Sequence, residues 1–307
     1  MKEVVIVDAV RSPIGRHSGG LSSVRPDDLL ADVLKALMDR TDVEPAAVED
    51  VYAGCGNQAG EDNRDVARMA ALLAGFPVEV SGITVNRNCS SGLEAVNLAA
   101  KSIIAGEGDI FVGAGVESMS RAPWSMPKPE RPQPVGHPRI WDTTVGWRYH
   151  NPKMEALYPI ISLGETAENI AEEMDVNREE QDAFALRSHQ NALNAQAEGR
   201  FDEEIVPVTV GITSPGNGKP RTQYSVVMKD EGPRADSSLE KLASLRHVFH
   251  AEGTVTAGNC SQMSDGEAVA LVMSAERARE LGLRPLARYV SFAVAGVPPE
   301  IMGIGPV

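Results

Sequence analysis

The first 118 residues alternate between strand-like and helix-like segments, and this alternation restricts the fold more than any other feature of the sequence. Short runs rich in β-branched residues are followed by stretches in which apolar residues recur every three or four positions. We expect strands at 3–10, 48–55, 82–86 and 109–118, and helices at 26–40, 65–75 and 91–106. Such an order predicts an α/β fold in which helices cover a sheet.

The pattern changes after this region. Residues 121–153 contain many prolines and few aliphatic side chains, which predicts an excursion with irregular loops. We then expect helices at 166–174, 177–199 and 275–283, and strands at 267–274 and 287–297. The helix at 91–106 is apolar almost all round, which predicts burial on every side, whereas the acidic residues of 165–182 are expected to form solvated helix surface.

Charge and cysteine content exclude several classes of protein. The net charge of −14 argues against nucleic acid or an anionic membrane as a partner. Three cysteines without close pairing do not form a disulfide framework, and they show no zinc-ligand spacing with the six histidines. There is no signal-peptide pattern and no run of about 18 apolar residues that would span a membrane. We therefore expect a cytoplasmic enzyme without a metal.

Cys89 lies where a predicted strand passes into a predicted helix, in the stretch "VNRNCSSGLEAV". Unpaired N–H groups at a helix N-terminus favour a thiolate, and they can also stabilise an oxyanion on a carbonyl that the thiolate attacks. The small residues Ser90, Ser91 and Gly92 leave room for a substrate. Local chemistry leaves a second interpretation open, because most free cysteines are simply small buried residues.

Five segments in a fixed order resemble the thiolases, a family of acetyl-CoA acetyltransferases and 3-ketoacyl-CoA thiolases. They are "NRNCSSGLEAV", "GAGVESMSRAP", "EEQDAFALRSHQNA", "GRFDEEIVPV" and "EGTVTAGNCSQMSDGEA". The resemblance covers all 307 residues, and "NRNCSSG" with "ESMSRAP" is more similar to the degradative branch, as in fatty-acid β-oxidation. It implies a layered fold with a mixed sheet covered by helices. Residues 1–118 and 263–285 would form the N-terminal domain, 119–262 an inserted loop domain, and 286–307 the start of an incomplete C-terminal domain.

The resemblance also implies roles for individual residues. Cys89 matches the nucleophile that becomes acylated during thiolysis or Claisen condensation. Ser261 and Ala257 match residues beside the pantetheine arm of CoA, and Arg234 matches an arginine near its adenosine phosphates. Leu163 takes a place near the acyl pocket that methionine often fills. CoA and acyl-CoA are then substrates, and no metal or redox cofactor is implied.

The sequence also departs from the family pattern. Thiolases continue into a second α/β half that carries an Asn-Glu-Ala-Phe motif, a Gly-His-Pro motif with the base, and a second reactive cysteine. The only Gly-His-Pro in this sequence is at 136–138, within the proline-rich segment, so we expect His137 to be a surface histidine. We expect Cys55 to be a small buried residue, and Cys260 to lie along the CoA groove without acting as a nucleophile.

Two alternatives remain beside an active thiolase. One is a truncated or split subunit that binds acyl-CoA or a partner but is inactive alone. The other is a relative of ketosynthases or hydroxymethylglutaryl-CoA synthases, against which "ESMSRAP" and "TVTAGNCSQMSDG" argue. As partners we expect a second copy in a homodimer or homotetramer, or a second polypeptide carrying the C-terminal half.

Overall fold

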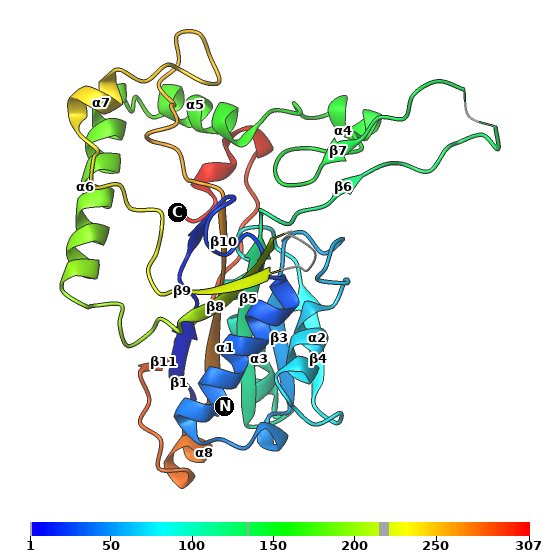
Figure 1. The fold of residues 1–307 in the computed structure, drawn as a ribbon, viewed down its shortest axis with the longest axis vertical. Helices are drawn as coiled ribbons and strands as arrows, with labels where there is room; N and C mark the ends of the chain where they lie inside the picture. The colour runs from blue at the N-terminus through cyan, green and yellow to red at the C-terminus, as the bar shows by residue number, and fades with distance from the viewer. Residues whose placement is uncertain (1, 134, 215–220) are drawn as a thin grey trace. The chain divides into compact units, whose positions relative to one another are not determined.

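The contacts of the chain group into two compact units. The computed structural model describes residues 2–133, 135–214 and 221–307 (Figure 1). The first, called the sheet unit below, comprises Met1–Ala122, Phe201–Gly232 and Met263–Phe292. The second, called the helical unit, comprises Pro123–Arg200, Pro233–Gln262 and Ala293–Val307.

The sheet unit is built on one mixed β-sheet. Its strands run in the order β11-β1-β10-β5-β3-β4, and β2 pairs with β10. The pairs β3–β4 and β3–β5 are parallel, whereas β10 is antiparallel to both β1 and β5. The strands are β1 (Val4–Arg11), β2 (Gly15–Arg16), β3 (Asp50–Gly54), β4 (Ser81–Val85), β5 (Ile110–Ser118), β10 (Ser264–Ser274) and β11 (Ala287–Arg288). The predicted α/β class with a mixed sheet is confirmed.

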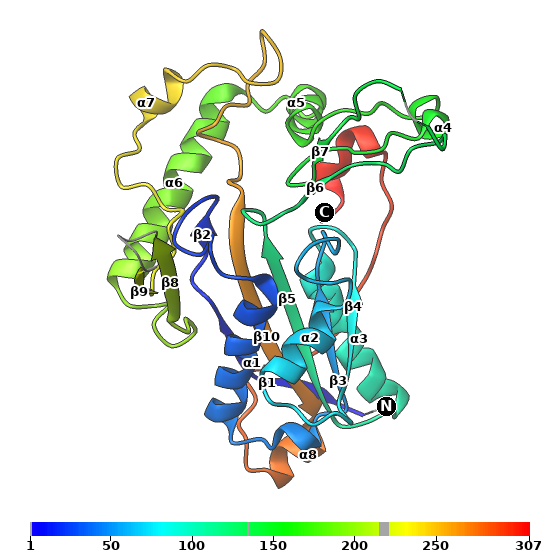
Figure 2. The same cartoon turned by 45° about the vertical axis from the view of Figure 1, so that its right-hand side comes forward.

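Helices cover both faces of this sheet (Figure 2). One core joins the sheet to α1 (Pro26–Thr41), α2 (Val66–Leu73) and α8 (Ala275–Glu280). The other core joins Val4, Phe111 and Val272 to α3 (Ser91–Ala105). A short 3-10 helix, η1 (Pro45–Ala47), precedes β3.

The hairpin of β8 (Val208–Ser214) and β9 (Arg221–Val227) packs against α1 and the segment before it. Its buried residues Val208 and Val210 form a small core with Leu21 and Leu29.

The helical unit contains the two long helices that the sequence predicts. They are α5 (Leu163–Glu173) and α6 (Arg178–Ala197), and each begins with a capping box, in which the cap side chain and the third helical residue bond each other's backbone. The remaining elements are short: β6 (Trp124–Ser125), β7 (Trp141–Asp142), α4 (Pro152–Glu155), α7 (Leu239–Ala243) and η2 (Pro299–Ile304). The described part of 121–153 is irregular apart from a two-residue strand pair and the start of α4, as its prolines predict.

The structure differs from three of the expectations drawn from the sequence. The strand expected at 287–297 pairs only at Ala287–Arg288, because β11 meets just two residues of β1, and Val290 and Val294 are exposed. The helix α3 is not buried on every side, since Leu93 is 67% exposed. The predicted domain boundaries stay a prediction. Residues 201–232, expected in the inserted domain, group with the sheet, where Arg11 forms ion pairs with Glu204 and Asp230.

None of the helices in the described ranges is long and apolar enough to cross a membrane.

Candidate active site

Cys89 is exposed on the turn between the end of β4 and the start of α3. It is therefore not a small buried residue, the second interpretation that local chemistry had left open. The backbone N–H groups of Gly92 and Leu93, in the first turn of α3, make no hydrogen bond among the residues that the structure describes. Such groups carry the partial positive charge of a helix N-terminus and are suited to an anion.

Neutral polar groups form most of the bonds that fix the turn around Cys89, and one ion pair, from Nε of Arg87 to Glu94 of α3 at 3.2 Å, adds to them. Asn88 has a left-handed backbone with φ of 49°, which asparagine tolerates better than most residues. Its N–H donates to Oδ1 of Asn86 at 2.9 Å, and its carbonyl accepts from the Ser91 hydroxyl at 2.6 Å. The same hydroxyl accepts from the N–H of Arg87 at 2.8 Å, and the Asn86 amide donates to the carbonyl of Gly56 at 2.9 Å. These bonds tie the turn to the end of β3.

Glycines in two strands allow α3 to begin directly on the sheet. A Cβ on Gly54 of β3 would lie 2.1 Å from the carbonyl carbon of Ser91. A Cβ on Gly113 of β5 would lie 2.7 Å from Cα of Val96, and one on Gly115 would lie 3.1 Å from Cα of Gly92. Real Cβ atoms essentially never approach backbone to less than 3.0 Å, so only glycine fits at Gly54 and Gly113 without displacing the helix.

The other two cysteines lie in different settings. Cys55 is buried, as expected, and burial raises the pKa of its thiol to about 12, with the charges of Glu117 and Asp62 acting in the same direction. Cys260 is exposed, and desolvation followed by the charge of Glu168 raises the pKa of its thiol. Both thiols therefore stay protonated more readily than a free cysteine.

The other predicted site residues lie in the helical unit. Leu163 is the exposed first residue of α5, and Arg234 is exposed beside Asp236, with 3.4 Å between Nε and Oδ1. The N–H of Arg234 donates to Nδ1 of His189 on α6 at 3.3 Å. Ala257 and Ser261 are exposed on one segment, Thr254–Ser261, which we call the pantetheine turn after the role that the resemblance implies. Their individual roles stay predictions.

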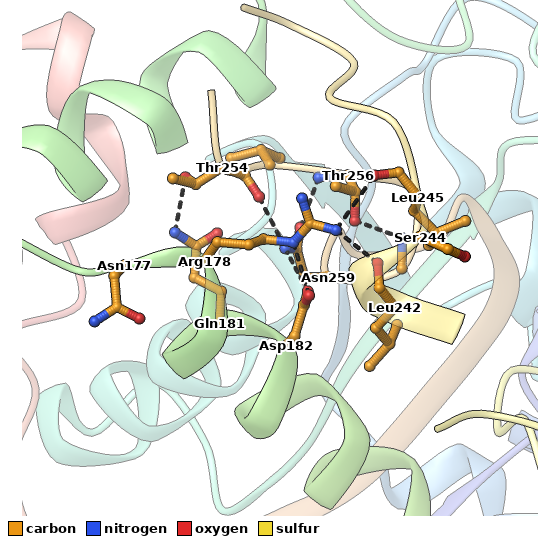
Figure 3. A network of polar contacts seen from close by, with 12 residues as sticks. Asn177, Arg178, Gln181, Asp182, Leu242, Ser244, Leu245, Thr254, Thr256 and Asn259 are labelled. Atoms are coloured by element: carbon orange, nitrogen blue, oxygen red, sulfur yellow. Dashed lines mark hydrogen bonds and ion pairs between the residues drawn. The ribbon is translucent and has the colours of Figure 1, made fainter. Parts of the chain in front are cut away.

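Two buried carboxylates hold the inner side of the pantetheine turn. Glu168 of α5 and Asp182 of α6 are 6% and 3% exposed, so the expectation that the acidic residues of 165–182 are solvated surface is wrong for both. Figure 3 shows Asp182, Arg178 and Asn259 meeting beneath the turn. The Arg178–Asp182 pair, one helical turn apart, was the available signal, but it does not distinguish a buried pair from a surface one.

No group of three or more metal-ligating side chains comes together in the described ranges. His137 is exposed in the irregular segment.

The comparisons with known proteins agree with this architecture. The family model "Thiolase, N-terminal domain" matches residues 4–276. A beta-ketoadipyl-CoA thiolase of Pseudomonas aeruginosa is 51% identical over 307 residues, which are 100% of this chain and 74% of the relative. A 3-ketoacyl-CoA thiolase of Bacillus subtilis is 44% identical, again over 100% of this chain and 75% of the relative.

A solved structure shows the same fold. The acetyl-CoA acetyltransferase of Bacillus anthracis superposes with a TM-score of 0.89 at 45% identity, over 99% of this chain and 74% of that one. The chain therefore belongs to the thiolase family and has its layered α/β fold. It is a transferase of the acyltransferase class by this membership, and the alternative of a ketosynthase relative has no support in these matches.

Proposed function

We propose that this chain transfers an acyl group between a 3-ketoacyl-CoA and CoA, with Cys89 as the nucleophile. The observation that carries the proposal is the exposed thiol of Cys89 at the start of α3, where the N–H groups of Gly92 and Leu93 make no hydrogen bond among the described residues. The Cys89 thiolate attacks the 3-keto carbon, and the bond between carbons 2 and 3 breaks. Acetyl-CoA leaves as its enolate and takes up a proton. The CoA thiol then attacks the acyl-cysteine thioester and releases the shortened acyl-CoA.

The pantetheine turn and Arg234 supply the CoA side of this proposal. Ser261 and Ala257 are assigned to the pantetheine arm, and the guanidinium of Arg234 suits the phosphates at the adenosine end. Leu163 contributes an apolar surface to the acyl group. CoA and acyl-CoA are substrates in this scheme, which needs no resident cofactor.

The relatives favour a particular substrate. Besides the Pseudomonas aeruginosa enzyme, a 3-oxoadipyl-CoA/3-oxo-5,6-dehydrosuberyl-CoA thiolase of Escherichia coli is 47% identical over 100% of this chain and 75% of the relative. We therefore propose a dicarboxylic 3-ketoacyl-CoA, as in the degradation of aromatic compounds, ahead of the monocarboxylic substrates of β-oxidation. Comparing kcat/KM for 3-oxoadipyl-CoA and 3-oxohexanoyl-CoA tests this choice, because the two differ only by the terminal carboxylate.

A labelling experiment tests the nucleophile. An alkylating acyl-CoA analogue at limiting concentration should modify Cys89 before the other two cysteines, as read by peptide mass mapping. Cys89→Ala should abolish acyl transfer, and Cys260→Ala, which removes the other exposed thiol, should retain it. First labelling of Cys55 or Cys260, or full turnover by the Cys89 variant, would overturn the assignment.

The remaining expectations concern assembly and location. A homodimer or homotetramer, a second polypeptide as partner, and a cytoplasmic location remain proposals. Light scattering on the purified chain measures the first, and co-purification from its own cells identifies the second. The chain tested alone also separates an active thiolase from a subunit that binds acyl-CoA without turnover.

A further inference from the structure

We propose that Glu168 and Asp182 are positioning residues that hold the pantetheine turn in the conformation that receives CoA. The inference rests on the proposed function, because it assumes that Ala257 and Ser261 contact the pantetheine arm. It goes beyond that function by assigning the shape of this subsite to two carboxylates that face away from the substrate side of the turn.

Glu168 holds the start of the turn. Its carboxylate accepts hydrogen bonds from the N–H of Thr254 at 2.8 Å, the N–H of Val255 at 2.9 Å and the Thr254 hydroxyl at 2.9 Å. A Cβ on Gly253 would lie 2.2 Å from Oε1, so any larger residue at this position would displace the carboxylate from the bonds it makes here. Desolvation alone would raise the pKa of Glu168, yet the hydrogen bonds from Thr254 and Val255 keep it below its ordinary value. The group is thus held as a carboxylate.

Asp182 holds the middle of the turn through Asn259. Its Oδ1 accepts from the Asn259 amide at 3.0 Å, and its Oδ2 receives Nε of Arg178 at 2.7 Å. The same Asn259 side chain accepts from the N–H of Thr256 at 2.8 Å and donates to the carbonyl of Thr254 at 3.1 Å (Figure 3). Arg178 in turn donates to the carbonyl of Leu242 at 2.6 Å, which connects the pair to the end of α7.

The turn is consequently fixed on one side and open on the other. Thr256 is fully buried between the two sets of bonds, whereas its neighbour Ala257 and the nearby Ser261 are exposed. The bonds from Glu168 and Asn259 go mainly to backbone N–H and C=O groups of the turn, and Asp182 acts on the turn through the Asn259 amide. The network therefore sets backbone conformation and leaves the exposed face free. A loop that is rigid before binding loses less entropy when the ligand arrives.

The physical properties of buried charges explain why charged side chains, rather than apolar ones, hold the turn. A buried ion pair adds little net stability compared with a well-packed apolar contact, because desolvation opposes the attraction. Its directional hydrogen bonds, however, specify one geometry in a way that apolar packing does not. A network of this kind is therefore better suited to shaping a binding surface than to stabilising the unit.

The test uses isosteric variants of the full chain. Glu168→Gln and Asp182→Asn keep the volume and remove the charge, and CoA affinity is measured by isothermal titration calorimetry. We expect each to weaken CoA binding about tenfold, the effect of one charge-assisted hydrogen bond. The controls are Glu172→Gln on α5 and Glu179→Gln on α6, exposed acids on the same helices, which should leave affinity unchanged.

A second readout distinguishes positioning from loss of structure. Amide hydrogen exchange should rise at Thr254–Cys260 in the two variants, while iodoacetamide should alkylate Cys89 at the rate of the unsubstituted chain. The double variant D182N/N259D restores an amide–carboxylate bond in the reverse direction and should recover part of the affinity. If D182N fails to fold, Asn259→Ala replaces it, since that change leaves Asp182 paired with Arg178.

The possible outcomes separate the two proposals. Unchanged CoA affinity and unchanged exchange in both carboxylate variants would overturn the positioning role and leave the proposed function standing. Failure of the unsubstituted chain to bind CoA would overturn the CoA-binding role of the turn, and the positioning role with it.

Discussion

The turn around Cys89 and the pantetheine turn are held in place by different forces. The Cys89 turn is fixed mainly by neutral side chains and by α3 resting on the glycines of β3 and β5, with one ion pair, Arg87–Glu94, beside it. The pantetheine turn is fixed by the carboxylates of Glu168 and Asp182. Steric contact does not depend on pH, whereas a carboxylate loses its acceptor strength when it is protonated. The two turns should therefore respond differently to substitution and to acid.

The largest effect should come from introducing a steric clash at Gly54, where β3 touches the start of α3. Gly54→Ala places a Cβ 2.1 Å from the backbone of Ser91, which must move. We expect a loss of about 3 kcal/mol in the free energy of unfolding, at the upper end of the usual range for overpacking. Urea unfolding measures the loss, and the rate of Cys89 alkylation by iodoacetamide reports the displaced turn.

Gly296→Ala is the matched control, because no atom lies within 4 Å of a Cβ at this position and its backbone is not left-handed. It should behave as the unsubstituted chain does. An equally stable Gly54 variant with unchanged alkylation would show that α3 is not seated by glycine contact.

The buried carboxyl groups of Glu267 in the sheet unit and Glu168 in the helical unit have pKa values shifted in opposite directions. Glu267 of β10 is buried in the sheet unit, and neither carboxyl oxygen has a hydrogen-bond partner among the described residues. Desolvation, followed by the charge of Asp32, raises its pKa well above the ordinary value. The unfolded chain therefore binds fewer protons between the two pKa values, and stability should fall as pH rises from about 4.3, by at most ~1.4 kcal/mol per pH unit.

Glu267→Gln should remove this dependence. Because glutamine does not ionise, the variant should lose less stability than the unsubstituted chain when unfolding is compared at pH 5 and pH 8. Equal slopes for both proteins would mean that Glu267 is not protonated in the folded chain.

Glu168 should show the opposite sign. Its pKa is lowered in the folded chain, so its contribution is complete above the unfolded pKa of about 4.3 and is lost as pH falls through the folded pKa. We expect the protection of the Thr254 and Val255 amides against hydrogen exchange, measured relative to the intrinsic rate at each pH, to fall in this acid range. Glu168→Gln should show lowered protection already at pH 7. Exchange at the backbone of Asn88 and Ser91 should follow no such titration, and a shared acid transition would contradict the contrast between the two turns.

These contrasts show what the sequence could and could not predict. Local periodicity located β1, β3, β4, β5 and β10 and the helices α1, α2, α3, α5, α6 and α8, and the motif around Cys89 located its turn, because both depend on neighbouring residues. It did not predict the β8–β9 hairpin or the shortest elements. The burial of Glu168 and Asp182 depends on Thr254 and Asn259, more than 70 residues later in the chain. The short length of β11 likewise depends on its pairing with only two residues of β1, which lies far away in the sequence. Such distant partners leave no periodic signal in the sequence.

The smallest effect should come from Arg234, whose charge is exposed rather than buried. Its side chain is 69% exposed and pairs with Asp236, so solvent screens any contact that it makes. Arg234→Ala should weaken CoA binding by about 1 kcal/mol, the upper end for a solvent-exposed ion pair, and added salt should abolish the difference. Arg200→Ala is the matched control, because Arg200 is 70% exposed and pairs with Glu198 in the same way. Calorimetric titration with CoA at low and high salt measures both variants. If the two arginine variants bind CoA equally well, Arg234 has no part in holding the phosphates.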